Sequence, residues 1–257
     1  MKLVRLFLVF FIFNSIYSFS QQVESGPSLQ DQYRKKVGNL RFSKTTIAFG
    51  KIKNNEVLTD TIYIYNTGKN EITIAAPAKL PAFLSVTINV GSLKPGEKGW
   101  MIVNYDAAKR NDFGIVFDRF FLTTSDDDQA AKNINLTATL QEFFPPAAEG
   151  DTLFAKAVFP ETVFDFGRIK QGEKVSKIFT VSNSGTKILL IRAVKNTCGC
   201  IKSSANKMEI NPGESVSIKV DYDSFAKEGK ETKTVFIYLS DPSMSEVKIE
   251  VRGEVFK

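Results

Sequence analysis

The two cysteines of the chain lie one residue apart, in Cys198-Gly199-Cys200. In an exported protein they can form a disulfide; a ring closed around one residue gains little loop entropy and is easily reduced, which makes the pair a redox candidate. Alternatively, two thiolates can hold a soft ion such as Cu(I), with Met208 or Met244 as a third ligand. The third interpretation is structural, with two small side chains filling the end of a domain. The residues leave all three interpretations open.

The sequence contains no histidine. This excludes a Ser-His or Cys-His nucleophile and every His-ligated metal site. The one acidic cluster, Asp126-Asp127-Asp128, offers oxygen ligands for Ca²⁺, but it lacks a glycine-containing loop of defined spacing and is more typical of a solvated loop. We therefore expect a protein that is not an enzyme, with no catalytic residue, no cofactor and no resident metal.

Charge and hydropathy indicate which classes of partner and which cell compartment to expect. The net charge is +6, but Lys and Arg are scattered among Asp and Glu without a basic stripe, so nucleic-acid binding is not expected. Residues 1–20 combine a basic start, the apolar run Leu6 to Phe13 and small residues near Ser20, which is typical of a secretory signal peptide. No later stretch is long enough to cross a bilayer as a helix.

The chain contains one domain twice. Four landmarks recur at a constant offset of 117 positions, which is hard to obtain by chance. The cysteine motif has no counterpart in the first copy, where Pro81, Ala82 and Phe83 stand, so the fold does not need it. The landmark pairs are Phe49-Gly50 with Phe166-Gly167, Asn66-Thr67-Gly68 with Asn183-Ser184-Gly185, Pro95-Gly96-Glu97 with Pro212-Gly213-Glu214, and Tyr105-Asp106 with Tyr222-Asp223.

Each copy is expected to be a β-sandwich. Apolar residues alternate with polar ones in short runs, and the Asn-x-Gly and Pro-Gly landmarks fall at turns, the former as residues that tolerate positive φ. About seven strands per copy, with turns every eight to twelve residues, predict two tandem immunoglobulin-like sandwiches, an all-β fold. The alternating runs include Val216, Ile218, Val220 and Tyr222, then Val247, Ile249 and Val251, with Met101, Val103 and Tyr105 and with Ile134, Leu136, Ala138 and Leu140 as their counterparts in the first copy.

The expected domain bounds follow from these patterns. The signal peptide at 1–20 is followed by an N-terminal arm at 21–41, in which Leu29, Tyr33 and Val37 have helical spacing, although a flexible arm is slightly favoured. The other bounds are 42–141 for the first immunoglobulin-like domain, 142–157 for a linker stiffened by Pro145-Pro146, and 158–257 for the second domain with Cys-Gly-Cys.

Two aromatic residues are candidate partner contacts. Trp100 is the only tryptophan, and it has the opposite parity from Met101 and Val103, so its side chain is expected on the outer face. Its counterpart is the polar Ser217. Phe121, on the next strand, also has outward parity, which favours a covered surface on the first domain. Packing of Trp100 against the linker or the arm is the structural alternative.

The second copy contains, in order, Phe164-Asp165-Phe166-Gly167-Arg168-Ile169, Phe179 to Gly185, Cys198-Gly199-Cys200, Asn211-Pro212-Gly213-Glu214 and Val220 to Asp223. With these motifs it strongly resembles the bacterial "domain of unknown function 1573" family, with which the immunoglobulin-like domains of Hydin and of the major sperm protein are grouped. The resemblance implies a non-catalytic module of exported proteins of Bacteroidota type. Asp60-Thr61-Ile62 and Asp151-Thr152-Leu153 are similar to the O-glycosylation acceptor of such bacteria, which makes Thr61 and Thr152 candidate sites.

The leading hypothesis is an exported binding or scaffold protein, an accessory subunit of an envelope assembly in the periplasm or at the outer membrane. Immunoglobulin-like domains have exposed edge strands that can pair with a protein partner. The first alternative is a thiol redox or Cu(I)-handling protein that uses Cys198 and Cys200. The second is a carbohydrate-binding module, for which the sequence offers no aromatic platform that can be placed.

Overall fold

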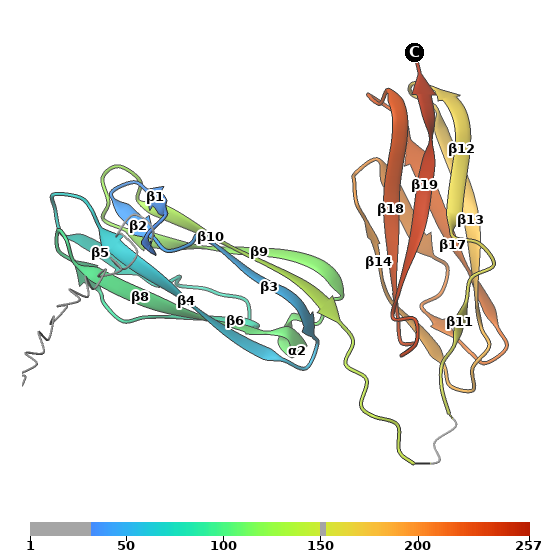
Figure 1. Ribbon diagram of the computed structural model, residues 1–257, viewed down its shortest axis with the longest axis horizontal. Coiled ribbons are helices and arrows are strands. Elements are labelled where there is room, and N and C mark those ends of the chain that lie inside the picture. Colours follow the sequence, from blue (N-terminus) through green and yellow to red (C-terminus); the bar gives the residue numbers. More distant parts are fainter. Residues whose placement is uncertain (1–31, 150–152) are drawn as a thin grey trace, which may run out of the picture. The chain divides into compact units, whose positions relative to one another are not determined.

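The computed structural model describes residues 32–149 and 153–257. Within these ranges the chain forms four sheets, two in each copy of the repeat. Figure 1 shows each copy as a sandwich of long strands, which confirms the expected tandem all-β architecture. The signal peptide expected at 1–20 lies outside the described residues, as does the first part of the arm.

The first sandwich has sheets of order β1-β2-β4-β8-β6 and β3-β10-β9-β5-β7. One short helix, α2, connects β8 to β9. The bounds are β1 (Lys35–Val37), β2 (Leu40–Phe42), β3 (Thr46–Lys53), β4 (Val57–Asn66), β5 (Ile72–Ala75), β6 (Leu84–Ile88), β7 (Ser92–Leu93), β8 (Lys98–Asp106), α2 (Ala107–Arg110), β9 (Gly114–Thr124) and β10 (Ala131–Gln141).

The second sandwich has sheets of order β11-β13-β17-β15 and β12-β19-β18-β14-β16. The bounds are β11 (Ala157–Val158), β12 (Val163–Lys170), β13 (Lys174–Asn183), β14 (Leu189–Asn196), β15 (Ile201–Ala205), β16 (Glu209–Ile210), β17 (Ser215–Asp223), β18 (Gly229–Leu239) and β19 (Glu246–Phe256).

The inward parity of the strands forms a separate core in each sandwich. The apolar sets expected from period-two alternation are buried, including Met101 and Val103 on β8 and Ile218 and Val220 on β17, all 0% exposed. The offset of 117 holds from β3 to β8. It falls to 115 from β9 onward, since Gly114 and Gly229 begin equivalent strands and the α2 connection is two residues longer than its counterpart.

Two landmarks are glycine positions with a left-handed backbone. Gly50 and Gly167 have φ of 72° and 68° and lie where the pairing registers of β3 and β12 shift, so each landmark is a β-bulge. Gly96 and Gly213 both have φ of 79°, and each follows the proline of its turn. The expectation that glycine reverses the chain after Pro95 and Pro212 agrees with these angles.

The Asn-x-Gly landmark works differently from the sequence expectation. Neither asparagine nor glycine there has a positive φ. Instead the Asn66 side chain is fully buried, its Nδ2 donates to the carbonyls of Asn70 and Leu93 (both 2.8 Å), and its Oδ1 accepts from the Gly68 N–H (2.8 Å). Asn183 repeats these three bonds in the second copy. The landmark is thus a buried side-chain staple between a turn and the next loop.

Replacing Asn66 by alanine should lower the unfolding free energy of the first sandwich by about 2–3 kcal/mol, because buried carbonyls and an N–H lose their partner. Calorimetry of the full chain would measure the shift. Asn70→Ala is the matched control, because only the backbone of Asn70 takes part, and it should change stability by less than about 0.5 kcal/mol. Equal effects of the two substitutions would contradict the staple.

The end of the N-terminal arm is a hairpin rather than a helix or a flexible segment. β1 pairs with β2, and β2 pairs with β4, so the segment is an edge of the first sheet. Leu40 and Phe42 are 0% exposed and belong to the core. The helical spacing of Tyr33 and Val37 was misleading because tertiary pairing with β4 decides the conformation.

A buried ion pair holds this hairpin. Asp126 forms an ion pair with Lys132, and both side chains are 0% exposed. Asp126 also accepts from the Asn39 backbone N–H (2.8 Å), while Lys132 Nζ donates to the Val37 carbonyl (3.0 Å). Asp126 is therefore neither solvated nor a Ca²⁺ ligand, which corrects both interpretations of the acidic cluster for this residue. Burial alone would raise the pKa of Asp126, but hydrogen bonds from Lys132 and then Asn39 lower it.

Candidate functional site

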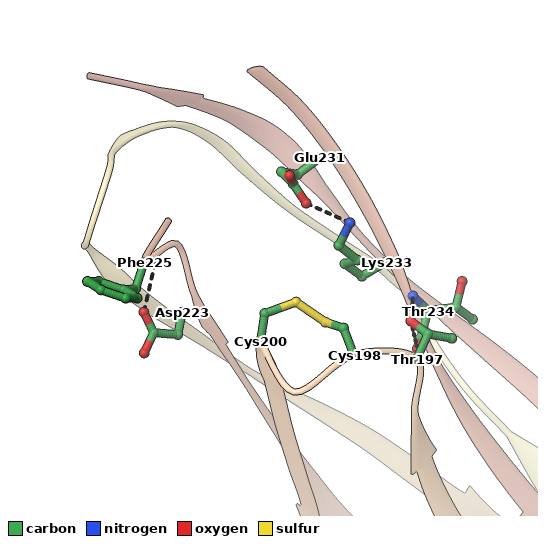
Figure 2. Close-up of a disulfide and its surroundings, with 8 residues drawn as sticks. All are labelled: Thr197, Cys198, Cys200, Asp223, Phe225, Glu231, Lys233 and Thr234. Carbon is green, nitrogen blue, oxygen red and sulfur yellow. Dashed lines mark hydrogen bonds and ion pairs between the residues drawn. A yellow bond between two sulfur atoms is a disulfide. The ribbon is translucent and has the colours of Figure 1, made fainter. Parts of the chain in front are cut away.

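The cysteines form a disulfide at the end of the second sandwich. Figure 2 shows Cys198 and Cys200 bridged in the loop between β14 and β15, where the chain crosses from one sheet to the other. Their Cα atoms are 5.2 Å apart. The Ile201 N–H donates to the Cys198 carbonyl (3.3 Å), which closes a tight turn, and the Asp223 N–H donates to the Cys200 carbonyl (2.9 Å). Both cysteines are half-buried and pack against the core.

The two methionines proposed as copper ligands are not brought to the cysteines. Met208 receives a hydrogen bond at its carbonyl from the Ile191 N–H, and Met244 donates its N–H to Asp241, which places both near the beginning of β14. The cysteines follow the other end of that strand. Among the residues that the structure describes, no three acidic, histidine or cysteine side chains are grouped for a metal. This geometry gives no support to the Cu(I) interpretation.

The two aromatic candidates lie on different sheets. Trp100 is half-buried on β8, directly opposite Tyr63 of β4, and its backbone N–H donates to Asn89 Oδ1 (2.6 Å). Phe121 is on β9, which belongs to the other sheet of the same sandwich, and is 48% exposed. Their outward parity agrees with the expectation, but they face opposite sides and do not form one surface.

The surface around Phe121 is larger than the sequence analysis indicated. Ile115, Phe117 and Phe121 project from the outer face of β9 with exposures of 47%, 75% and 48%. Arg119 lies between them, with its guanidinium 5.7 Å from the Phe121 ring centroid. Their counterparts on β18 are mostly polar, with Lys230 and Thr232 in place of Ile115 and Phe117. In the sequence, Ile115 and Phe117 have the same parity as Phe121, so the alternation alone predicts that all three lie on the outer face.

The same stretch of β9 is an open strand edge. On β9, β5 pairs only with Thr123 and Thr124, and within residues 32–149 and 153–257 no strand pairs with β9 from Ile115 to Leu122 on the side away from β10. The Thr124 N–H points toward β10 and the Ser125 N–H toward β5. Because strand N–H groups alternate, the backbones of Phe117, Arg119 and Phe121 face the open side.

Proline explains why the edge is open in the first copy. Pro77 stands where Val194 continues β14, and a proline has no N–H to donate to a ladder. β14 therefore runs on to Asn196 and pairs with β18 as far as Val235, whereas β5 ends at Ala75. The corresponding part of β9, including Phe121, remains uncovered.

Few charged side chains lie on the outer face of β9 and β10. The outward residues of β9 and β10 include one cation, Arg119, and no carboxylate. Asp118 has the opposite parity and accepts from Arg110 Nε (3.2 Å). The face would therefore attract a segment that combines apolar side chains with a carboxylate. The outward residues of β10 are Ala131, Asn133, Asn135, Thr137, Thr139 and Gln141.

The two glycosylation candidates, Thr61 and Thr152, lie in different parts of the chain. Thr61 is half-buried within β4, which pairs with β2 and β8, and the Asp60 carboxylate accepts from the Lys44 ammonium (2.7 Å). Thr152 lies outside the described residues. Thr61 therefore sits in a paired strand, where a sugar-transferring enzyme has access only from the outer face.

These features define a class of protein: tandem immunoglobulin-like sandwiches in which one copy has an open strand edge and the other a disulfide. Residues 157–255 match the family described as "Protein of unknown function (DUF1573)". Residues 38–139 match the "HYDIN/CFA65/VesB-like, Ig-like domain" family. The resemblance of the second copy is thus confirmed, and the first copy matches the Hydin-type immunoglobulin-like family that was grouped with it.

The fold is shared with a solved structure, and two others are similar at lower TM-scores. A protein of unknown function from Porphyromonas gingivalis W83 has a TM-score of 0.59 and 18% identity, over 84% of this chain and 100% of that one. A PapD-like domain of human CEP192 has a TM-score of 0.34 and 8% identity, over 45% and 94%. The secreted serine protease VesC from Vibrio cholerae has a TM-score of 0.30 and 11% identity, over 82% and 50%. No curated protein matches the chain. Among the described residues, no helix has the length and apolar character of a membrane span.

Proposed function

We propose that the protein is an exported, non-catalytic binding or scaffold protein of the cell envelope, and that its first sandwich binds a protein partner by strand addition at β9. The observation that carries the proposal is the coincidence of an open strand edge with exposed apolar side chains at Phe117 and Phe121. Pairing supplies backbone hydrogen bonds, and the side chains on the same strand supply specificity.

The internal repeat supports a functional origin for this edge. In the second sandwich β14 pairs with β18 from Val235 to Leu239, which covers the stretch equivalent to Phe120–Thr124, and Lys230 and Thr232 stand where the first sandwich has Ile115 and Phe117. The fold is therefore complete without the apolar residues. An unprotected apolar edge is an aggregation hazard that proteins usually avoid, so its presence in one copy favours use by a partner.

The proposed occupant is an extended segment of another protein with alternating apolar residues and an Asp or Glu facing Arg119. The charge follows from the face itself, because Arg119 is its one cation and no carboxylate balances it among the outward residues of β9 and β10. The residues at 1–20 support export to the compartment where this partner would be met.

A photo-cross-linker at position 117, in intact cells of the producing bacterium, should give a discrete adduct in the envelope fraction. The same group at Thr232, the equivalent position of the second sandwich, should give none. Strand addition is tested by comparing Phe121→Pro with Phe121→Ala, because both remove the ring and only proline removes the N–H at the edge. The proline variant should lower adduct yield about fivefold relative to alanine.

Three results would count against the proposal. The absence of an adduct at position 117 would show that no partner binds at β9. Equal adducts at 117 and 232 would show that binding is not specific to the first sandwich. Equal yields from the proline and alanine variants would show that the partner covers the face without pairing to the edge. Arg119→Glu should weaken the adduct and shift its salt dependence, since it reverses the one charge of the face.

A further inference from the structure

The first sandwich serves as an internal control for the disulfide. At the position of Cys200 it has Phe83, whose ring lies 5.6 Å from the Tyr105 ring and 4.9 Å from the Arg110 guanidinium. The Tyr105 hydroxyl donates to Asp118 (3.2 Å). This end of the sandwich is therefore closed by aromatic and ionic contacts alone. The fold does not require a disulfide at this position.

The disulfide is open to approach from solvent. Gly199, between the cysteines, is exposed, and a Cβ placed on it would meet nothing within 4 Å. Its φ is not in the left-handed region, so the turn does not need glycine for its backbone conformation. A cavity of about 290 Å³ lies beside Gly199 and Cys200 and is also lined by Lys202. A thiol carried by another protein can therefore reach the bridge.

Next to Cys200, whose carbonyl accepts from the Asp223 N–H, β17 contributes a buried donor without an acceptor. Tyr222 is 1% exposed, and its hydroxyl has no hydrogen-bond partner among the described residues. Its counterpart Tyr105 donates to Asp118, but Lys233 takes the place of that aspartate in the second copy and pairs with Glu231 (2.7 Å). Burial, and then Glu231 and Asp223, raise the pKa of Tyr222 to about 12, so the hydroxyl keeps its proton at neutral pH.

We propose that Cys198–Cys200 is a thiol–disulfide exchange site that oxidises a dithiol of a partner protein, with Tyr222 as a positioning residue that donates to the Cys200 thiolate. A partner thiolate attacks Cys198 Sγ, a mixed disulfide forms, and the electron pair of the broken S–S bond leaves on Cys200 Sγ. The thiolate is the acceptor that the Tyr222 hydroxyl lacks. Hydrogen bonding to a thiolate lowers its pKa and makes it a better leaving group.

The second partner thiolate then attacks the partner sulfur of the mixed disulfide and releases Cys198. Two electrons and two protons pass from the partner dithiol, which becomes a disulfide, to the cysteine pair, which becomes two thiols. Exchange with an external disulfide in the reverse sense restores the bridge. Because the ring encloses one residue, closure constrains the unfolded chain very little, and reduction sacrifices little stability.

The experiment uses the purified full chain and, as probe, a synthetic peptide with two cysteines. Alkylation and mass spectrometry would follow the thiols while calorimetry follows the fold. The peptide should be oxidised in equal amount as the protein gains two thiols, and the second sandwich should melt unchanged. A pair that stays oxidised under a tenfold excess of dithiothreitol, or a sandwich that unfolds on reduction, would overturn the proposal.

Two variants test the role of Tyr222. Tyr222→Phe should slow reduction by the peptide about tenfold without lowering the melting temperature, because the hydroxyl it removes is unpaired. Tyr105→Phe is the matched control, which loses a bond to Asp118 and should leave the exchange rate unchanged. An unaltered rate in Tyr222→Phe would refute the positioning role. These measurements do not involve β9, so they succeed or fail independently of strand addition.

Discussion

Replacing Lys132 by methionine is expected to lower the unfolding free energy of the first sandwich by about 3–4 kcal/mol. Methionine keeps the length of the side chain but removes the ammonium that faces Asp126. Both side chains are 0% exposed, so solvent cannot take over the lost interaction. The Val37 carbonyl loses its donor as well, which loosens the β1–β2 hairpin. Calorimetry of the full chain would report this as a shift confined to one transition.

The second sandwich provides a matched rescue. It has Val247 at the position of Lys132 and keeps an aspartate, Asp241, at the position of Asp126. Asp241 is satisfied by the Ala157 N–H (2.8 Å) and by both the N–H and the hydroxyl of Ser243. Lys132→Val combined with Asp128→Ser copies that arrangement and should recover at least half of the lost stability. If the single Lys132→Met variant is as stable as the parent, the pair does not stabilise the fold.

The pH dependence gives a second readout of the same pair. The folded pKa of Asp126 is lowered below its usual value, so its stabilisation is present above the unfolded pKa, about 3.9, and is lost as the pH falls through the folded pKa. The first sandwich of the parent should therefore lose stability below about pH 4. In Lys132→Met this acid dependence should be weaker, because the ammonium that lowers the pKa is absent. An unchanged slope would contradict the assignment.

The sequence was sufficient for the alternation and the repeat because both are local. Inward parity identified Met101 and Val103, and a constant offset identified the copies. The staple formed by Asn66 was not predictable in its mechanism, since its acceptor on Leu93 is 27 positions away. Lys132 carried a visible signal that was not used: it has the same parity as Ile134 and Leu136, where a lysine must be buried or must break the strand.

For the candidate sites, too, the local features were predictable from the sequence and the features that depend on distant residues were not. Cys198 and Cys200 could be identified from residue type, but their alternatives could not be resolved, because the distant placement of Met208 and Met244 depends on the path of β14. The open edge at Phe121 depends on how far a strand from elsewhere in the chain continues. Pro77 was a signal for that ending, although only the register of β5 with β9 shows which residues it uncovers.

Two of the places where the copies diverge coincide with the candidate sites. In the first copy Pro77 ends β5 and the outer face of β9 becomes apolar. In the second copy β14 continues, the face becomes polar, and the cysteines occupy the turn that follows. Residues that form bulges, staples and turns are retained in both. Each copy therefore carries its candidate site on a scaffold that the other copy shows to be stable without it.

The largest effect is expected from the N-terminal boundary, which we propose lies at or before Lys35 rather than at residue 42. A chain that begins at residue 44 should lose the folded first sandwich, whereas one that begins at residue 32 should keep it. The shorter chain lacks Leu40 and Phe42, both 0% exposed, and deleting such core side chains costs about 3–5 kcal/mol each. Their sum is comparable to the total stability of a domain, about 5–15 kcal/mol.

The same deletion removes Asn39, whose N–H satisfies Asp126, and uncovers the edge of β4 that pairs with β2. The buried ion pair would then face water on one side, and β4 would offer an unpaired ladder. Limited proteolysis and calorimetry should show one transition in the chain from residue 44 and two in the chain from residue 32, with the second sandwich as the internal reference. Equal melting of the first sandwich in both chains would mean that β1 and β2 are only an arm and that the domain begins where the alternation of β3 begins.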